Sequence, residues 1–194
     1  MTKYETLFVV LALVAIGVAG RLLPHLPNFA PVTASALFCG AYMNRRVSFA
    51  ALGVTLLISD YLLLYVSPYS GLHLNHVYEP WALWHTTLPY VYGSFALSAL
   101  AGWFLKGRRS PGVIGVATVF CSLQFFLITN AGVWAAGAYD RGINGLWESY
   151  VAGLPFFRGT LLGDLFYTSV FFGLWEFASA FRREAAASTA YAVD

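Results

Sequence analysis

The chain has 194 residues, the length of one domain, but its composition is not that of a soluble domain. Hydrophobic residues make up 59% of it and charged residues 10%, and the mean hydropathy is +0.66. Soluble globular proteins spend about 25% of their residues on charge, so this chain could not cover a surface that faces water. The composition excludes a soluble enzyme, a disordered chain and a disulfide scaffold, and predicts an integral membrane protein.

Six apolar segments are candidates for membrane-spanning helices, since about 17–25 apolar residues cross a bilayer. The first also has features of a signal peptide, but its removal would break a consistent set of six, so we expect it to be retained. The second is short enough to be tilted, re-entrant or longer than its apolar run. The run from Tyr150 onward is interrupted by Leu154-Pro155, which fits a lead-in segment better than a seventh span. The segments are residues 6–20, 31–43, 47–66, 88–105, 112–134 and 159–181.

The basic residues predict an orientation. In a six-span arrangement only Arg21, Arg141 and Arg158 fall on one side of the membrane, and the other eight fall on the opposite side. By the positive-inside rule both termini are then cytoplasmic. We predict one all-α domain of six transmembrane helices over residues 1–183 and a short cytoplasmic tail over 184–194, in a bacterial inner membrane. The eight residues are Lys3, Arg45, Arg46, Lys106, Arg108, Arg109, Arg182 and Arg183.

Three of the predicted spans carry a polar residue in what would be the outer half of the membrane: Asp60, Asn130 and Asp164. An isolated carboxylate that faces lipid costs several kcal/mol, so these groups should face the bundle interior, paired or hydrated. For Asp164 we expect a polar partner on another helix, with Arg158 or Asn130 as the leading candidates. The alternative to a ligand site is that both acids form structural salt bridges with Arg21 or Arg158.

The outer loops concentrate aromatic residues and hold all four histidines. The second outer loop, residues 67–87, is long for a helix connection, and its aromatic content predicts a lid over Asp60 and Asp164. Its tryptophans could instead be anchors at the lipid headgroups. The spacing of His73 and His76, with His85 beyond them, leaves open a metal site.

The sequence contains no Walker motif, no G-x-S-x-G, no H-E-x-x-H and no C-x-x-C. Cys39 and Cys121 match no metal-ligand spacing, and the short basic connections are topogenic charges that do not form a nucleic-acid surface. We therefore predict no enzymatic activity, no resident cofactor and no nucleic-acid partner. Any pumping would need energy from a partner protein or an ion gradient.

Three stretches resemble a bacterial membrane family of unknown function that is related to the substrate-binding S components of energy-coupling-factor (ECF) transporters. They are residues 21–32 (RLLPHLPNFAPV), 125–134 (FFLITNAGVW) and 154–164 (LPFFRGTLLGD). The resemblance implies a six-helix bundle that binds a vitamin or similar micronutrient near the outer face. It also implies a coupling module, a transmembrane protein plus two ATPases, as partner. Ala15-x-x-x-Ala19 has the spacing of the docking motif on helix one of S components, but lies toward the outer end of the span.

The sequence thus predicts an S-component-like protein that captures a small molecule at the outer face for uptake. The alternative is a non-transporting membrane protein that binds a metal or haem through its outer histidines, or that scaffolds a partner. The predicted substrate-binding residues combine the polar groups of the outer half with aromatic walls. They are Asn28, Asp60, Trp81, Trp84, His85, Asn130, Trp134, Arg158 and Asp164.

Overall fold

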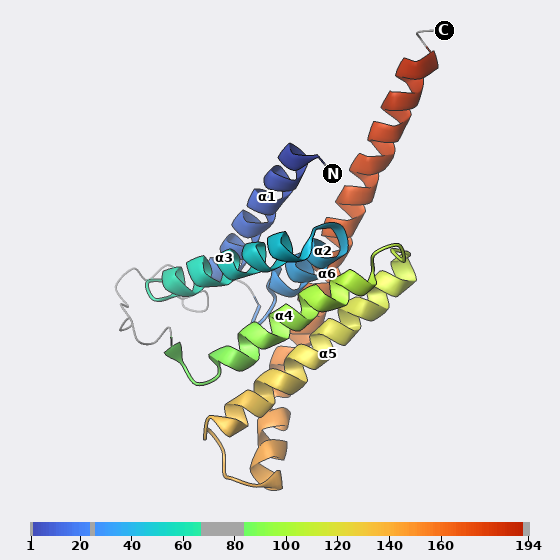
Figure 1. The fold of residues 1–194 in the computed structure, drawn as a ribbon. Coiled ribbons are helices and arrows are strands. Elements are labelled where there is room, and N and C mark those ends of the chain that lie inside the picture. Colours follow the sequence, from blue (N-terminus) through green and yellow to red (C-terminus); the bar gives the residue numbers. More distant parts are fainter. Residues whose placement is uncertain (1, 24–25, 67–83, 192–194) are drawn as a thin grey trace.

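A computed structural model describes residues 2–23, 26–66 and 84–191, and these ranges contain six helices and no strand. The six predicted segments coincide with these helices, which confirms the all-helical prediction. Figure 1 shows the helices side by side, with the N-terminus and the end of the last helix both in the upper part of the view. The helices are α1 (Lys3–Leu22), α2 (Val32–Tyr42), α3 (Arg45–Leu63), α4 (Leu88–Phe104), α5 (Pro111–Ala135) and α6 (Ile143–Tyr191).

Three helices begin with capping residues. The Thr2 hydroxyl accepts a hydrogen bond from the backbone N–H of Glu5, and the Glu5 carboxylate accepts one from the backbone N–H of Thr2. Asn44 before α3 and Ser110 before α5 each accept from the backbone N–H three residues on, at 3.0 and 3.5 Å. Such side chains satisfy donors that the first helical turn leaves unpaired. They account for where α1, α3 and α5 start.

The short helix α2 lies at the centre of the bundle, and all its residues from 32 to 41 are buried. Gly40 of α2 crosses Gly102 of α4 so closely that a side chain on either would collide with the backbone of the other helix. Small residues permit this approach. On another side of α2, the Phe38 ring packs edge-on against Phe172 of α6, with ring centroids 5.2 Å apart. Helix α2 therefore ties α4 to α6.

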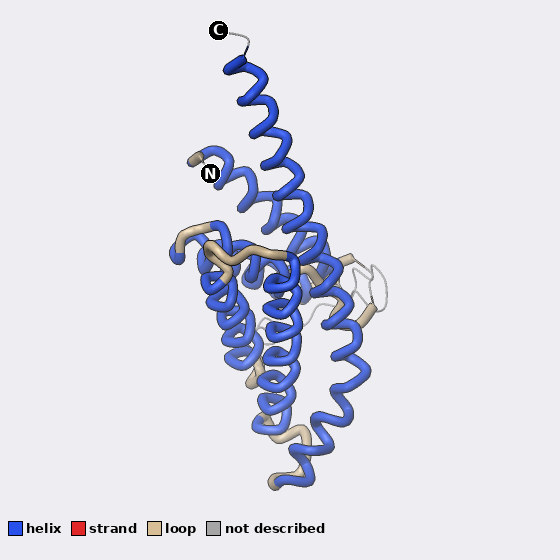
Figure 2. Tube along the Cα trace, turned by 90° about the vertical axis from the view of Figure 1, so that its right-hand side faces the viewer, coloured by secondary structure: helices blue, strands red, loops and turns tan. Residues whose placement is uncertain are grey.

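Helix α6 is continuous over 49 residues, longer than the span predicted over 159–181. It passes through Pro155, so the interruption predicted at Leu154-Pro155 is wrong. A proline removes one backbone hydrogen bond and can bend a helix without ending it. The residues from 184 onward, predicted as a tail, continue the helix as far as Tyr191. Figure 2 shows these last turns projecting beyond the other helices.

Within the described residues, three helices are long and apolar enough to cross a membrane: α1, α3 and α5. Helix α2 has 11 residues, which span about 16 Å at 1.5 Å per residue, about half of the hydrocarbon core of a bilayer. The predicted second span is therefore a helix, but one too short to cross a bilayer by itself.

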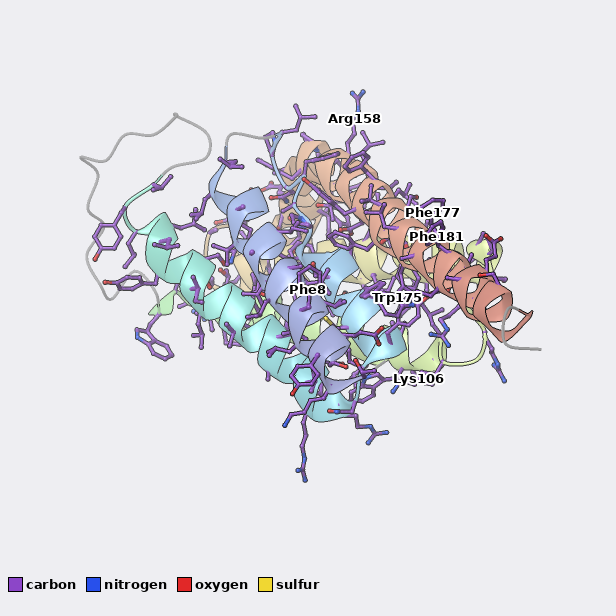
Figure 3. The ribbon with its side chains drawn as sticks, turned by 90° about the horizontal axis from the view of Figure 1, so that it is seen from above. Phe8, Lys106, Arg158, Trp175, Phe177 and Phe181 are labelled. Carbon is purple, nitrogen blue, oxygen red and sulfur yellow. The ribbon has the colours of Figure 1, made fainter. Side chains whose placement is uncertain are left out.

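The surface of the helices carries many large apolar side chains, and the interior combines an apolar core with buried hydroxyl groups. Phe8 of α1 and Phe177 and Phe181 of α6, labelled in Figure 3, are large, apolar and exposed, and Phe8 is 73% exposed. The interior instead contains hydroxyl side chains that bond to backbone carbonyls, as a membrane interior requires of every polar group. This arrangement indicates a membrane protein. The fully buried hydroxyl residues are Ser48, Ser59, Ser94, Ser98, Thr118 and Ser122.

Candidate functional site

The eight basic residues predicted to share one side lie at one end of the bundle, which we name the basic end. The Lys106 ammonium donates to the backbone oxygen of Met43 at 2.8 Å and so joins the α4–α5 link to the α2–α3 link. Arg182 near the end of α6 forms a 3.1 Å salt bridge with Glu5 at the start of α1. We name the opposite end, where α1 connects to α2, α3 to α4 and α5 to α6, the far end.

At the far end, four polar side chains from three helices form the Asp60 cluster: Arg21 of α1, Ser59 and Asp60 of α3, and Tyr92 of α4. The Arg21 guanidinium lies 2.6 Å from Asp60 Oδ1 and also donates to the Ser59 hydroxyl. The Tyr92 hydroxyl donates to Asp60 Oδ2 at 2.6 Å. Both carboxylate oxygens therefore have a partner. This is the Arg21 salt bridge that the sequence offered as the alternative to a ligand site.

A second group, the Asp164 cluster, consists of Asp164 of α6, Ser122 of α5 and Thr33 of α2. The Ser122 hydroxyl donates to Asp164 Oδ2 at 2.7 Å, and the Thr33 side chain lies close enough to the carboxylate to favour its charged form. Asp164 is 1% exposed. Thr33 is the second residue of α2, so the carboxylate lies near the positive end of that helix dipole. Within the described ranges no Lys, Arg or His forms a salt bridge with Asp164.

The prediction that Asp164 has a polar partner on another helix is therefore confirmed, but the predicted identity of that partner is wrong. A polar group on a different helix does bond the carboxylate, but it is Ser122, in the middle of α5, and neither Asn130 nor Arg158. Arg158 precedes Asp164 by six residues, which places the two side chains about 120° apart around the helix. It is exposed, and Figure 3 shows it pointing away from the bundle.

The chain between α1 and α2 packs on α6 next to Asp164. Gly159 of α6 faces the backbone oxygen of Pro27, and Gly163 faces Phe29, so closely that a side chain at Gly159 would collide with that oxygen. Asn28 between them has a φ of 59°, a left-handed conformation that asparagine adopts more readily than most residues. Two of the stretches that carry the family resemblance, 21–32 and 154–164, are thus in direct contact.

The other predicted site residues are spread over the far end. Asn130 donates from its side chain to Phe126 of its own helix, while its backbone oxygen accepts from Ser149 of α6 at 2.8 Å. The Trp134 indole donates to the backbone oxygen of Asp140 at 3.2 Å. The exposed residues are Asn28, Trp84, His85 and Arg158, and Trp81 lies outside the described residues, as does most of the predicted lid.

Three grooves run along the outside of the helices. Between α1 and α3 lies a groove of about 620 Å³, between α5 and α6 one of about 520 Å³, and between α1 and α6 one of about 300 Å³. None of the eight predicted site residues that the structure describes lines these three grooves. The α5–α6 groove starts beside the Asp164 cluster, at Thr118, Leu165 and Thr168, and reaches Arg109 and Glu176 at the basic end.

The sequence analysis missed the residues that hold the two acids, namely Thr33, Tyr92 and Ser122. A signal existed, because hydroxyl residues recur four positions apart in apolar helices, as Thr118 and Ser122 do in α5. That spacing places both on one helix face. Each lies within hydrogen-bond distance of the carbonyl four residues back, where a hydroxyl can be satisfied within its own helix, and the single proton of the Ser122 hydroxyl goes either to that carbonyl or to Asp164. Only the structure identifies which of them also bonds a carboxylate.

Among the residues described, no three His, Cys, Asp or Glu side chains are placed to hold a metal ion. Of the histidines considered for a metal site, His85 bonds the Thr87 hydroxyl at 2.8 Å, while His73 and His76 lie outside the described ranges. Cys39 and Cys121 are buried free thiols.

Comparison with known proteins places the chain in a family. No curated protein and no solved structure matches it. A family of unknown function, DUF6580, matches residues 2–187, which include all three stretches named above and all six helices up to the last turn of α6. The chain therefore belongs to the DUF6580 family.

Proposed function

We propose that this chain is an S-component-like uptake protein of a bacterial inner membrane, which captures a small molecule such as a micronutrient at its outer face. In this proposal the six helices form a transmembrane bundle, the basic end faces the cytoplasm, and the far end faces outward. The observation that carries the proposal is that both carboxylates inside the bundle, Asp60 and Asp164, bond side chains of other helices on the far-end side. Ionisable groups within membrane helices generally mark substrate or ion pathways.

The far end also supplies the other parts that such a site requires. The half-buried residues Asn130 and Trp134 lie at the end of α5, and the packed 26–31 segment borders Asp164. Ligand sites in proteins are mostly apolar and aromatic, with a few placed polar groups. On α1, Ala15 and Ala19 are exposed, which leaves them accessible to a coupling module as the S-component resemblance implies.

Orientation is tested by single cysteines at the two ends. Ser188→Cys lies at the exposed end of α6 on the basic side, and Ala138→Cys lies in the exposed turn between α5 and α6. The native Cys39 and Cys121 are buried and serve as unreactive background. In intact spheroplasts a membrane-impermeant maleimide should label Ala138→Cys and spare Ser188→Cys. The reverse pattern would refute the proposed orientation, and with it outer-face capture.

Ligand capture is tested by mass spectrometry of small molecules that co-purify with the protein in mild detergent. The wild-type protein should retain a compound that an unrelated membrane protein from the same membranes does not. Asn130→Ala, at a predicted site residue whose side chain bonds Phe126 of its own helix, should retain at least about tenfold less, equivalent to about 1.4 kcal/mol. Ser169→Ala is the matched control, since that exposed hydroxyl bonds only Leu165 of its own helix. Absence of a specific compound from the wild-type protein would refute capture.

A further inference from the structure

We propose that Asp164 is a proton-binding site, that the α5–α6 groove connects it with the basic end, and that proton movement through Asp164 drives uptake. The last step rests on the proposed function. The chain has no recognisable nucleotide-hydrolysing motif, so uptake needs energy from a partner protein or an ion gradient, and this proposal takes the second source. The Asp164 cluster has the features that a proton site requires.

The first feature is a buried carboxyl group whose partners carry no positive charge. Helix α5 presents Ser122 and the Cys121 thiol to Asp164, and helix α2 presents Thr33. Cys121 is the titratable group of the described residues that interacts with Asp164, and a thiol brings no positive charge. The α2 dipole and the hydroxyl donors favour the charged form, but burial favours the neutral form and no Lys, Arg or His of the described residues pairs with the carboxylate. These opposing influences suit a group that binds and releases a proton.

The second feature is that the same partners fit both protonation states. A hydroxyl group can donate to a carboxylate, and it can accept from a protonated carboxyl group. The 2.7 Å distance between Ser122 Oγ and Asp164 Oδ2 is that of a hydrogen bond. In the forward step an O–H bond forms at Asp164 with a proton from water. In the return step that bond breaks and the proton passes to water, with no other bond made or broken.

The third feature is a polar path from Asp164 to the basic end. Thr168 follows Asp164 by one helical turn and lines the α5–α6 groove. Its hydroxyl is buried and has no hydrogen-bond partner among the described residues. Buried polar atoms of this kind are usually satisfied by ordered water. Water bound at Thr168 would stand between Asp164 and the charged groups at the mouth of the groove, Arg109 and Glu176.

The proton site is tested without any ligand, by infrared spectroscopy of the purified full-length protein in detergent. The wild-type protein should show the carbonyl stretch of a protonated carboxyl group, and it should decline as the pH is raised from about 5 to about 9. Asp164→Asn should lack this band, Asp60→Asn should keep it, and Asp164→Glu should keep it at a shifted frequency. A band that survives Asp164→Asn, or a wild-type protein with no titrating band, would overturn the assignment. If Asp164→Asn does not fold, the shifted band of Asp164→Glu decides.

The path is tested by the rate at which this band shifts after transfer to D₂O. Thr168→Val keeps the side-chain shape but removes the hydroxyl, and should slow the exchange at least tenfold. Thr129→Val on α5 is the matched control, because that hydroxyl bonds Phe125 of its own helix and does not line the groove, and it should leave the rate unchanged. Equal rates in wild-type and Thr168→Val would exclude the groove as the route.

Coupling is tested in liposomes that contain a trapped pH dye, with the small-molecule fraction of culture medium as the probe. Addition of this fraction should acidify the interior with the wild-type protein and leave it unchanged with Asp164→Asn. Accumulation of a compound without acidification would refute coupling. If no compound is retained or accumulated while the infrared band still titrates, the proposed uptake function fails and the proton site stands.

Discussion

The two carboxylates inside the bundle have opposite surroundings. Asp60 has a guanidinium on one oxygen and a tyrosine hydroxyl on the other, and its side chain and that of Arg21 keep 16% and 19% of their surface exposed. Asp164 is closed off from solvent and bonds only hydroxyl groups among the described residues. A paired acid keeps its charge and ties helices together, whereas an acid with neutral partners can change its charge at little cost to the fold.

This difference assigns different tasks to two halves of the molecule. The Asp60 cluster joins α1, α3 and α4, so its ion pair acts as a fixed tie at the far end. The Asp164 cluster joins α2, α5 and α6, where the 26–31 segment and the α5–α6 groove approach the carboxyl group from two directions. The Asp60 cluster holds a fixed ion pair, and the Asp164 cluster exchanges a proton.

The largest expected effect comes from separating the 26–31 segment from α6. In Gly159→Ala the new methyl group would collide with the backbone oxygen of Pro27, which cannot move without shifting the whole segment. We expect a loss of about 3 kcal/mol in the free energy of unfolding, measured by SDS titration in mixed micelles. Gly173→Ala on the same helix has open space around it and is the matched control. Equal stability of the two variants would mean that the segment does not rest on α6 as described.

Removal of the cation from the Asp60 cluster comes next. Arg21→Met leaves Asp60 charged and half-buried beside Tyr92 alone, which should cost about 2 kcal/mol by the same titration. Arg158→Met, at the same end but exposed, should change stability by less than about 0.5 kcal/mol. Adding Asp60→Asn to Arg21→Met should recover part of the loss, because no unpaired charge remains. A double variant less stable than Arg21→Met alone would contradict the fixed ion pair.

The same substitution at the two acids tests the comparison directly. Asp60→Asn leaves Arg21 without its counter-charge and should cost about 1.5 kcal/mol. With Asp164 neutral as proposed, Asp164→Asn replaces one neutral group with another of the same shape, which can still bond Ser122, and should cost less than about 0.5 kcal/mol. If Asp164→Asn is the more damaging, Asp164 carries a charge that the surrounding structure stabilises, and the assignment of the two clusters is wrong.

Much of the helical arrangement could be predicted from the sequence because it depends on patterns along the chain. Apolar runs located the helices, and the spacing of basic residues located one end, since both signals are local. The interruption expected at Pro155 failed for a physical reason: one missing hydrogen bond is tolerated in a long helix whose other bonds remain.

The side-chain partners could not be predicted, because they depend on how the helices are rotated about their axes. Asp164 was expected near Arg158 or Asn130 from depth alone, yet the side chain six residues away on a helix points to another face. Asp60 pairs with Arg21 because the ends of α1 and α3 adjoin. Of the two interpretations offered for this acid, a ligand site and a structural salt bridge, only the second anticipated this contact. The position of a residue along its helix can be read from the sequence, but the direction in which its side chain points depends on how the helices pack.

The smallest expected effect concerns the hydroxyl that bonds Asp164. Ser122→Ala removes the donor to Asp164 Oδ2, so a neutral carboxyl group would lose one hydrogen bond, at about 1 kcal/mol. Ser169→Ala removes a hydroxyl that bonds only its own helix, and should cost almost nothing.

The pH dependence of the stability loss in Ser122→Ala tests the proton site. If Asp164 gains and loses a proton, the charged form needs the Ser122 donor more than the neutral form does. The deficit of Ser122→Ala relative to wild type should then grow as the pH is raised from about 5 to about 9. A deficit that stays constant over this range would show that the carboxyl group does not change its charge in the folded protein.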